Sequence, residues 1–367
     1  MLRIARKFCR AFIIGTVIAT QPFSNLYSSP SSGAAWAGES FPTSRDKWVW
    51  PFAQNSIWNM PIGSGANYTP ANIQKAPYGS ADQEYFYKTK TTDPLRKVYA
   101  PGSWTNRCSG TAPSYSPDLR VPDNLIVKDA TAVPYETPNN AAAFLMPDGQ
   151  TLVQLEPLAR CVTGGPLYGY HYSEDLNISG PGIGGSHFGS GLSAIGGSIR
   201  RGELTKSDPI RHALKVVIWG NMYLHYSKST PGYRWPATLA DANAANQYHG
   251  ANPKLVMGTL LAIPPKQTAD SLGLQTPAAK KLFRALQNYG AYVVDDAGWD
   301  AHYFAVEQGV LGEFQNTYGY EFGGNQGVFY EEFMKLFQAL HIVDNNGAKS
   351  IGGGGTPRQP LAPPFRN

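Results

Sequence analysis

The residues with the clearest chemical potential lie in and after a glycine-rich stretch. Seven glycines fall between residues 182 and 197, where they allow positive φ or the close approach of another group. His187 lies within this stretch, and Arg200, Arg201, Glu203 and His212 follow it. A binding or catalytic site can be built from conformationally free glycines next to titratable side chains that rigid elements hold in place. Glycine-rich turns of an ordinary β protein have the same composition, so a structural role stays open.

Glu203 and His212 are candidate catalytic residues. Glu203 lies two residues after Arg201 in a segment, 198–204, that we expect to be a strand, so the two side chains would share one face. A surface ion pair would show the same spacing. His212 begins the apolar run 213–219 and is a candidate for proton transfer or positioning, although a structural histidine also fits that place.

Asp295 and Asp296 form a second candidate group at the end of the apolar run 291–294. Two neighbouring carboxylates can shift each other's pKa so that the two values differ, and this suits acid/base catalysis. A turn in which Asp caps backbone N–H groups is the alternative. His187 is the fifth candidate catalytic residue, because its glycine neighbours favour ligand contact. The surrounding stretch lacks the Gly-Lys-Ser/Thr of a phosphate loop and the Gly-x-Ser-x-Gly of a nucleophile elbow.

Aromatic residues beside Gly, Pro or Asn predict contacts with sugars. Seven Trp and twenty Tyr lie after residue 37. Sugar C–H groups pack on ring faces while sugar hydroxyls take hydrogen bonds. Tyr233 and Trp235 are the predicted substrate-binding aromatics, and Arg200 and Arg201 are the predicted substrate-binding cations. Rings packed in a β core would give the same counts.

Residues 1–37 are predicted to be a signal peptide. Four basic residues precede the short apolar run 11–19, and a small-residue cleavage site follows at 35–37. The run is too short to span a bilayer, and no later segment approaches the length required. We therefore expect a secreted protein, extracellular or periplasmic, with no integral membrane segment in the mature chain.

The mature chain is expected to be close to neutral. The whole sequence has 31 basic and 26 acidic residues, and four of the basic ones lie in the first 37 residues, which leaves 27 and 26. A neutral chain lacks the basic surplus with which proteins bind phosphate backbones. We therefore expect no nucleic acid partner.

Cys108 and Cys161 are the cysteines that remain once Cys9 leaves with the signal peptide. In an oxidising compartment this even count favours one disulfide, and a pair of free thiols is the alternative. Neither cysteine has a second ligand at metal-binding spacing. We expect no metal and no cofactor.

Composition favours a β-rich extracellular protein. The 39 glycines and 29 prolines approach a fifth of the chain, and charged residues are few. We predict a mainly β fold, with a β-sandwich or jelly-roll-like body, a few peripheral helices and a long extended N-terminal arm. A partly closed barrel is the alternative. A single domain, residues 38–346, and a Gly/Pro-rich extended tail, residues 347–367, complete the predicted organisation.

Local patterns place strands and helices along this body. The apolar runs 142–146 and 150–156 predict a hairpin. Thr276 as N-cap and Pro277 at the first helical position predict a helix that Gly290 closes. The other predicted elements are a helix at 330–340 and strands at 124–128, 198–204, 212–219, 222–226, 255–263 and 291–295.

Three blocks of this chain resemble a set of secreted bacterial proteins. These blocks are the arm Pro-Phe-x-x-x-Ser-x-Trp-Asn-x-Pro-Ile at 51–62, the segment 191–203, and Ile-x-His-Ala-Leu at 210–214. The resemblance implies relatedness and secretion, and it attaches no reaction. Its recurrent polar positions coincide with Arg200, Glu203, His212 and Asp295.

Together these patterns predict a secreted carbohydrate-active enzyme that cleaves a polysaccharide or oligosaccharide. Glycoside hydrolysis, with Glu203 and Asp295 or Asp296 as the acid/base carboxylates, is preferred. A polysaccharide lyase is the alternative enzyme, with Tyr or His as base and with Arg, His or a cation to neutralise a uronate. A non-catalytic extracellular glycan-binding or surface protein is the alternative from another class. We expect residues 182–197 to line the site and to bring His187 and Asp295 together with Glu203.

Overall fold

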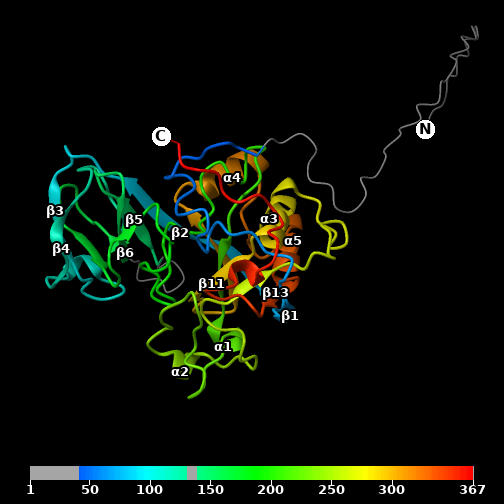
Figure 1. Cartoon of the computed structure of the whole chain (residues 1–367). Helices are drawn as coiled ribbons and strands as arrows, with labels where there is room; N and C mark the ends of the chain where they lie inside the picture. Colours follow the sequence, from blue (N-terminus) through cyan, green and yellow to red (C-terminus); the bar gives the residue numbers. More distant parts are fainter. Residues whose placement is uncertain (1–40, 130–138, 367) are drawn as a thin grey trace, which may run out of the picture. The chain divides into compact units, whose positions relative to one another are not determined.

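Strands dominate the structure, which confirms the mainly β fold predicted from the sequence (Figure 1). The computed structural model describes residues 41–129 and 139–366, which belong to one compact unit. The predicted signal peptide, residues 1–37, lies outside the described residues. Within the described ranges, no helix is long and apolar enough to cross a membrane.

Thirteen strands of the described chain form one mixed sheet. In chain order they are β1 (Tyr68–Pro70), β2 (Tyr78–Lys88), β3 (Leu95–Tyr99), β4 (Pro113–Arg120), β5 (Ala142–Leu145), β6 (Thr151–Ala159), β7 (Leu167–Tyr170), β8 (Leu176–Asn177), β9 (Leu214–Ile218), β10 (Leu260–Ala262), β11 (Ala291–Asp296), β12 (Ala301–Glu307) and β13 (His341–Val343). Their order across the sheet is β1-β13-β10-β11-β9-β12-β2-β5-β6-β7-β3-β4, and β8 pairs with β6. The pairs β9–β11, β2–β12, β2–β5 and β3–β7 are parallel. The predicted hairpin is confirmed, because β5 and β6 pair in antiparallel fashion.

The longer helices lie in the C-terminal part of the chain. They are α3 (Pro277–Asn288), α4 (Val310–Tyr318) and α5 (Val328–Gln338), and two single-turn helices precede them, α1 (Gly220–Tyr223) and α2 (Ala244–Gln247). The predicted start of α3 is confirmed, since the Thr276 side chain accepts a hydrogen bond from the Ala279 N–H at 3.2 Å. Helices α3 and α5 pack side by side near β11 and β13 (Figure 1).

Alternate residues of the central strands face two different cores. Val216 and Ile218 of β9 belong to the core that contains the buried faces of α3, α4 and α5. Val217 of β9 and Tyr292 of β11 belong to a second core, which contains Trp58 and part of the glycine-rich stretch. This division follows from the two-residue period of a strand. One face of the sheet therefore meets the helices, and the other meets the arm and the glycine-rich stretch.

The N-terminal arm and the C-terminal tail both pack against this body. Residues 51–62 form no helix or strand, and Trp58 within them is 1% exposed. The Gly65 N–H donates a hydrogen bond to the Gly354 carbonyl at 2.9 Å, so the tail lies beside the segment that follows the arm. Extended backbone without strand partners needs such contacts to satisfy its polar groups.

The predicted strand at 198–204 is wrong. These residues form turns, with a single isolated bridge between Ile199 and Val306. The Glu203 carboxylate accepts a hydrogen bond from the Arg200 N–H at 2.6 Å and closes one of these turns. Such local side-chain bonds compete with a strand ladder.

Two other predicted strands are also wrong. The predicted strand at 222–226 begins inside α1, which ends at Tyr223, and the Asp296 carboxylate accepts the first N–H of that helix at 2.5 Å. A carboxylate at the N-terminus of a helix satisfies a backbone donor that lacks a partner in the helix. Segment 124–128 is reduced to one bridge between Val127 and Arg160.

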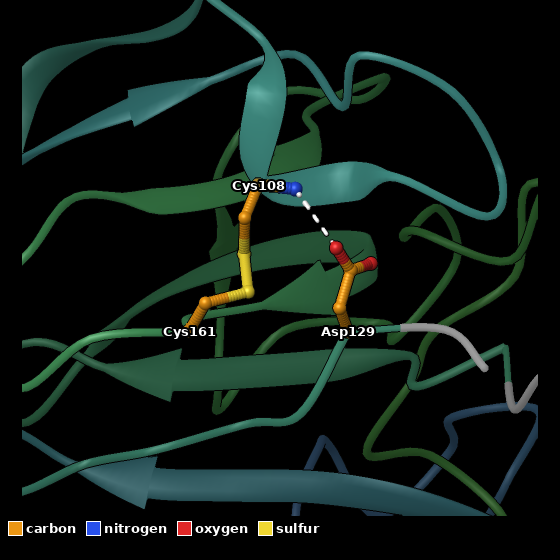
Figure 2. Close-up of side chains that lie close together, drawn as sticks. All are labelled: Cys108, Asp129 and Cys161. Atoms are coloured by element: carbon orange, nitrogen blue, oxygen red, sulfur yellow. Dashed lines mark hydrogen bonds between the residues drawn. A yellow bond between two sulfur atoms is a disulfide. The ribbon is translucent and has the colours of Figure 1, made fainter.

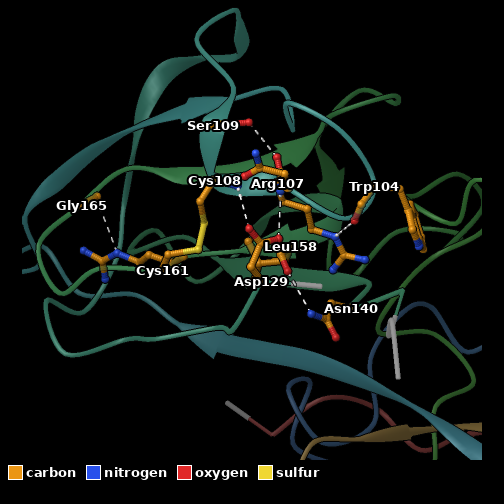
Figure 3. The surroundings of a disulfide bond; sticks show 11 residues. Trp104, Arg107, Cys108, Ser109, Asp129, Asn140, Leu158, Cys161 and Gly165 are labelled. Atoms are coloured by element: carbon orange, nitrogen blue, oxygen red, sulfur yellow. Dashed lines mark hydrogen bonds between the residues drawn. A yellow bond between two sulfur atoms is a disulfide. The ribbon is translucent and has the colours of Figure 1, made fainter. Parts of the chain in front are cut away.

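The predicted disulfide between Cys108 and Cys161 is confirmed (Figure 2). It joins the 3₁₀ turn η1 (Arg107–Ser109) to the residue that follows Arg160 at the end of β6, across 53 residues. The Asp129 carboxylate accepts hydrogen bonds from the backbone N–H groups of Arg107, at 2.9 Å, and Cys108, at 3.3 Å. The buried Arg107 guanidinium lies 4.6 Å from the centre of the Trp104 ring (Figure 3). The disulfide therefore ties the turn that carries this buried cation to the segment after β6.

Candidate active site

Six titratable side chains meet in the interior of the protein, and we call this group the acidic centre. Strand β2 contributes two of them, strands β6, β9 and β11 contribute one each, and the glycine-rich stretch contributes the sixth. Five of the six are at most 6% exposed, whereas the sixth, on β2, is partly exposed. Side chains of these types are seldom buried unless they are paired or functional. The acidic centre consists of Asp82, Glu84, Glu156, His187, Lys215 and Asp295.

A buried ion pair forms the base of the acidic centre. The Lys215 ammonium group donates to both carboxylate oxygens of Glu84, at 2.6 and 2.8 Å, and to the backbone carbonyls of residues 193 and 194. His187 Nε2 lies 2.8 Å from Glu84 Oε1. Burial lowers the pKa of Lys215, and the Glu84 carboxylate opposes this shift. The ion pair therefore fixes one edge of the His187 ring.

A β-bulge in β11 directs Asp295 towards the acidic centre. The register shifts after Val293, so that Asp295 pairs with Val217 and Asp296 pairs with Ile218. Val217 faces the second core and Ile218 faces the helices. Bulges re-aim side chains in this way and are frequent beside active sites. The predicted pair of aspartates is thus divided between opposite faces of the sheet.

The glycine-rich stretch carries His187 to the acidic centre. Its backbone passes so close to β11 that a Cβ at Gly189 would lie 2.6 Å from Asp295 Oδ1. Further along, a Cβ at Gly196 would lie 2.4 Å from the Trp58 ring. A side chain at either position would push the stretch away from its partner. The glycines therefore serve the packing that places His187.

Glu156, His187 and Asp295 surround one small space. Each offers an oxygen or nitrogen atom, and these atoms lie within 4.8 Å of one another. Glu156 Oε2 also accepts a hydrogen bond from the Phe188 N–H at 3.1 Å, and Asp295 Oδ2 accepts one from Asn139 Nδ2 at 2.7 Å. A gap of this size between an imidazole and two carboxyl groups admits a water molecule or a cation but not a sugar ring. These three residues could hold a metal ion.

The carboxyl groups of the acidic centre have raised pKa values. Burial, reinforced by the neighbouring carboxylates of Asp295 and Glu84, raises the pKa of Glu156 well above its usual value. Burial and nearby carboxylates do the same for Asp295. Burial and the charge of Glu84 raise the pKa of Asp82 to about 7. Burial and the neighbouring ammonium group lower the pKa of His187. These shifts favour the protonated form of the carboxyl groups and the neutral form of the imidazole.

Aromatic rings lie beside the acidic centre. The Phe188 ring packs against Tyr172 and Tyr170, with ring centroids 3.9 and 5.5 Å away. Phe188 is also the residue whose N–H bonds to Glu156. Tyr172 is 48% exposed. An exposed phenol ring next to buried carboxyl groups is a surface on which a sugar can stack.

Glu203 and His212 pair with each other, and we call them the outer pair. His212 Nε2 lies 3.1 and 3.2 Å from the two carboxylate oxygens of Glu203, and Nδ1 lies 2.8 Å from the Ala213 carbonyl. Although burial disfavours the imidazolium, the Glu203 carboxylate raises the pKa of His212. Both ring nitrogens are satisfied. The structure thus brings Glu203 together with His212, and His187 together with Asp295, in two different groups.

The predicted substrate-binding residues lie outside the acidic centre. Arg200 Nε donates to Glu307 at 2.9 Å, and Arg201 Nε donates to Glu313 at 3.2 Å. Tyr233 is 37% exposed. The remaining member of this predicted set, Trp235, packs against the second core.

Two hollows are lined by no residue of the acidic centre. The first, lined by Trp50, Trp58, Arg200 and His212 among others, has a volume of about 10 Å³. This is room for one water molecule and not for a sugar. The second measures about 280 Å³ and is lined by residues that include Trp48, Lys88, Leu145 and Met146. The outer pair therefore borders a space too small for the predicted substrate.

Sequence reasoning missed four members of the acidic centre. Lys215 is a lone charge within the apolar run 213–219, and Glu156 is the last residue of the run 150–156. A charged residue inside such a run is the signal that indicates a buried ion pair or a functional site. Asp82 and Glu84 lie in a tyrosine-rich segment whose strand was not predicted, although their spacing places them on one face of it.

Comparison with known proteins yields no relative. No protein-family model, curated protein or solved structure matches this chain. The resemblance to secreted bacterial proteins stays a prediction.

Proposed function

We propose that the protein is a secreted glycoside hydrolase that cleaves a polysaccharide or oligosaccharide at the acidic centre. The observation that carries this proposal is the convergence of three carboxyl groups, those of Asp82, Glu156 and Asp295. Burial raises the pKa of Glu156 and of Asp295, and the neighbouring Asp82 carboxylate raises both further. Glycosidic hydrolysis needs a carboxylic acid that protonates the leaving oxygen and a second group that activates water or stabilises the sugar cation. The exposed ring of Tyr172 offers a stacking surface for a sugar beside these groups.

Asp82 is the general acid in this proposal. Unlike Glu156 and Asp295 it is partly exposed, so a substrate can reach it. Its pKa of about 7 keeps a large share of it protonated in neutral solution. Catalytic acids whose pKa lies near the working pH transfer protons most effectively.

Glu156, His187 and Asp295 act together on the attacking water. The gap between them is too small for a sugar ring, so they cannot flank the scissile bond as a pair. They can bind one water molecule and accept its proton as the oxygen attacks the anomeric carbon. Direct attack by water produces the inverted anomeric configuration.

The charges around the site favour hydrolysis over lyase chemistry. A lyase neutralises the carboxylate of a uronate with an arginine, a histidine or a cation. Arg200 and Arg201, which were candidates for that role, bond to Glu307 and Glu313. The acidic centre is rich in carboxyl groups and suits an uncharged sugar better than an anionic one.

The experiment that tests the proposal replaces Asp82 with Asn. Wild-type protein is assayed on a panel of neutral polysaccharides for new reducing ends, and NMR identifies the anomer that forms first. We expect Asp82→Asn to reduce the rate by about 10²–10⁴-fold, because removing a general acid has effects of this size. Asp118→Asn is the matched control, since Asp118 forms an exposed ion pair with Lys97 and should keep full activity.

Other results of this assay would contradict the proposal. Undiminished cleavage by Asp82→Asn would remove Asp82 from the mechanism. Unsaturated products, detected by their ultraviolet absorbance, would establish a lyase. Binding on a glycan array with no product after long incubation would establish the non-catalytic alternative.

A further inference from the structure

We propose that Glu156, His187 and Asp295 bind one divalent first-row transition-metal ion, such as Zn²⁺ or Mn²⁺. The three donor atoms lie within 4.8 Å of one another and come from β6, the glycine-rich stretch and β11. Each of these side chains is at most 6% exposed. Metal sites that proteins build in their interior have this form, with few ligands on separate rigid elements.

The His187 ring supplies an observation that is independent of the carboxyl groups. Its Nδ1 has no hydrogen-bond partner, although the residue is only 3% exposed. Its Nε2 lies 2.8 Å from Glu84 Oε1 and 3.1 Å from Lys215 Nζ. Lys215 has three closer acceptors for its three protons, namely the two carboxylate oxygens of Glu84 and the backbone carbonyl of residue 194. Nε2 therefore carries the ring proton and donates it to Glu84. The lone pair of Nδ1 is left facing Glu156.

The distance between Nδ1 and Glu156 Oε2 fits two ligands of one ion. The two atoms are 3.6 Å apart, which is too far for a hydrogen bond. Two ligands of a tetrahedral ion, each about 2.0–2.1 Å from the metal, are roughly 3.4 Å apart. Two lone-pair atoms held at this distance in a buried site are stabilised by a cation between them.

The donor set selects the class of metal. One imidazole nitrogen and two carboxylate oxygens suit Zn²⁺, Mn²⁺ or Fe²⁺, whereas Ca²⁺ and Mg²⁺ prefer sites made of oxygen alone. Two ionised carboxylates balance the charge of a divalent ion. Glu84 takes the supporting position, because a carboxylate that accepts the second ring N–H orients the imidazole of many metal sites.

Binding of the ion does not depend on the proposed hydrolysis. If the protein is the hydrolase proposed above, the bound ion would act on the attacking water in place of these three side chains, by lowering the pKa of that water, and this role alone rests on the proposed function. The metal is therefore tested first by binding.

The experiment uses the purified protein, stripped with a chelator and titrated with MnCl₂ or ZnCl₂. Isothermal titration should give one ion per chain. The six-line electron paramagnetic resonance signal of free Mn²⁺ should disappear on binding, and electron spin-echo modulation should show one directly coordinated imidazole nitrogen. Absence of binding at millimolar metal, or bound Mn²⁺ without nitrogen coupling, overturns the inference.

Two histidine variants serve as test and control. We expect His187→Ala to weaken metal binding by at least about 100-fold, beyond the 10- to 100-fold loss typical of supporting residues. His212→Ala should bind as tightly as wild type, because both nitrogens of His212 have partners elsewhere. Equal affinity of His187→Ala and wild type overturns the inference. Should His187→Ala fail to fold, the nitrogen coupling of wild-type protein decides the question.

Asp82→Asn separates this inference from the proposed function. It should lose hydrolysis and keep the metal, since Asp82 is not a ligand. A wild-type protein that hydrolyses glycans and binds no metal contradicts only the metal site. A protein that binds the metal and cleaves no glycan contradicts only the proposed function.

Discussion

The acidic centre and the outer pair both join a buried histidine to a glutamate, and they differ in how the ring is satisfied. In the outer pair, His212 has the Ala213 carbonyl on one nitrogen and Glu203 on the other. In the acidic centre, His187 has Glu84 on one nitrogen, while the other has no hydrogen-bond partner and faces Glu156. Fully satisfied buried groups add rigidity, whereas an unsatisfied one calls for a ligand or a functional explanation.

The balance of charge separates the two groups further. Glu203 neutralises His212 and raises its pKa despite the burial of the ring, as a structural ion pair does. Burial and the Asp295 carboxylate raise the pKa of Glu156, and the neighbouring Lys215 is already paired with Glu84. An arrangement that leaves like charges together in the interior is typical of catalytic and metal sites. This difference predicts that the acidic centre carries out catalysis and that the outer pair stabilises the fold.

The largest expected effect is on catalysis. We expect Glu156→Gln to reduce glycan hydrolysis by about 10²–10⁴-fold, because it removes one acceptor of the proton from water. Glu203→Gln should change the rate less than about threefold, since the outer pair borders a space of about 10 Å³. The burial that raises the pKa of Glu156 makes the neutral amide tolerable, so Glu156→Gln should fold. Initial rates of both variants check this, and the reverse order would assign the chemistry to the outer pair.

The next effect is on stability. Lys215→Met leaves the Glu84 carboxylate buried without its cation, and we expect a loss of about 3–5 kcal/mol in the free energy of unfolding. Glu203→Gln keeps a hydrogen-bond acceptor for the partly exposed outer pair and should cost about 1–2 kcal/mol. Urea denaturation of the two variants measures both values. Equal losses would show that burial does not distinguish the two ion pairs.

A smaller effect is expected from the glycine-rich stretch. Gly189→Ala places a Cβ 2.6 Å from Asp295 Oδ1 and should cost about 1–3 kcal/mol through displacement of the stretch. Gly298→Ala is the control, because a Cβ there meets no atom within 4 Å. Thermal unfolding and metal affinity of both variants test whether the stretch holds His187 in place. A Gly189→Ala protein as stable as wild type would show that the close approach has no structural role.

The smallest effect is the pH dependence of stability in metal-free protein. The folded-state pKa values of Asp82, about 7, and of His212 are raised, so the stability that each contributes is present at low pH and is lost as pH rises through the folded value. The pKa of His187 is lowered from 6.5, so its contribution has the opposite sign: stability is lost as pH falls through 6.5 and is regained as pH rises. We expect the melting temperature to fall by a few degrees between pH 6.5 and 8. His212→Gln should flatten that slope and His187→Gln should not, as calorimetry would show.

Local patterns predicted those elements that local interactions decide. Thr276 and Pro277 start α3 as expected, because a cap and a fixed φ act within a few residues. The prediction of a strand at 198–204 was wrong because the Glu203 side chain accepts a hydrogen bond from the Arg200 N–H and closes a turn. Strand propensity does not account for such a side-chain bond. Strand β2, which carries Asp82 and Glu84, was not predicted because apolar and polar residues do not alternate clearly along its tyrosine-rich sequence.

Of the candidate site, the sequence indicated His187 and Asp295 as single residues but not their partners. The glycines around His187 and the apolar strand before Asp295 were visible in the sequence. Glu156 and Lys215 were not selected, although a charge within an apolar run is the pattern that marks them. The choice of Glu203 as the companion of His187 came from nearness in the chain, which differs from nearness in space.

The amino-acid sequence by itself determined the mainly β class, the pairing of Cys108 with Cys161 and the capped start of α3, because composition, cysteine number and short-range bonds are sufficient for these features. Only the tertiary structure decided which carboxyl groups share a site. Glu156, His187 and Asp295 come from segments far apart in the chain, and their meeting depends on the order of strands and on the bulge that turns Asp295 to one face of β11. Strand order and register arise from the packing of the whole sheet, since a shift of one residue sends every side chain to the opposite face.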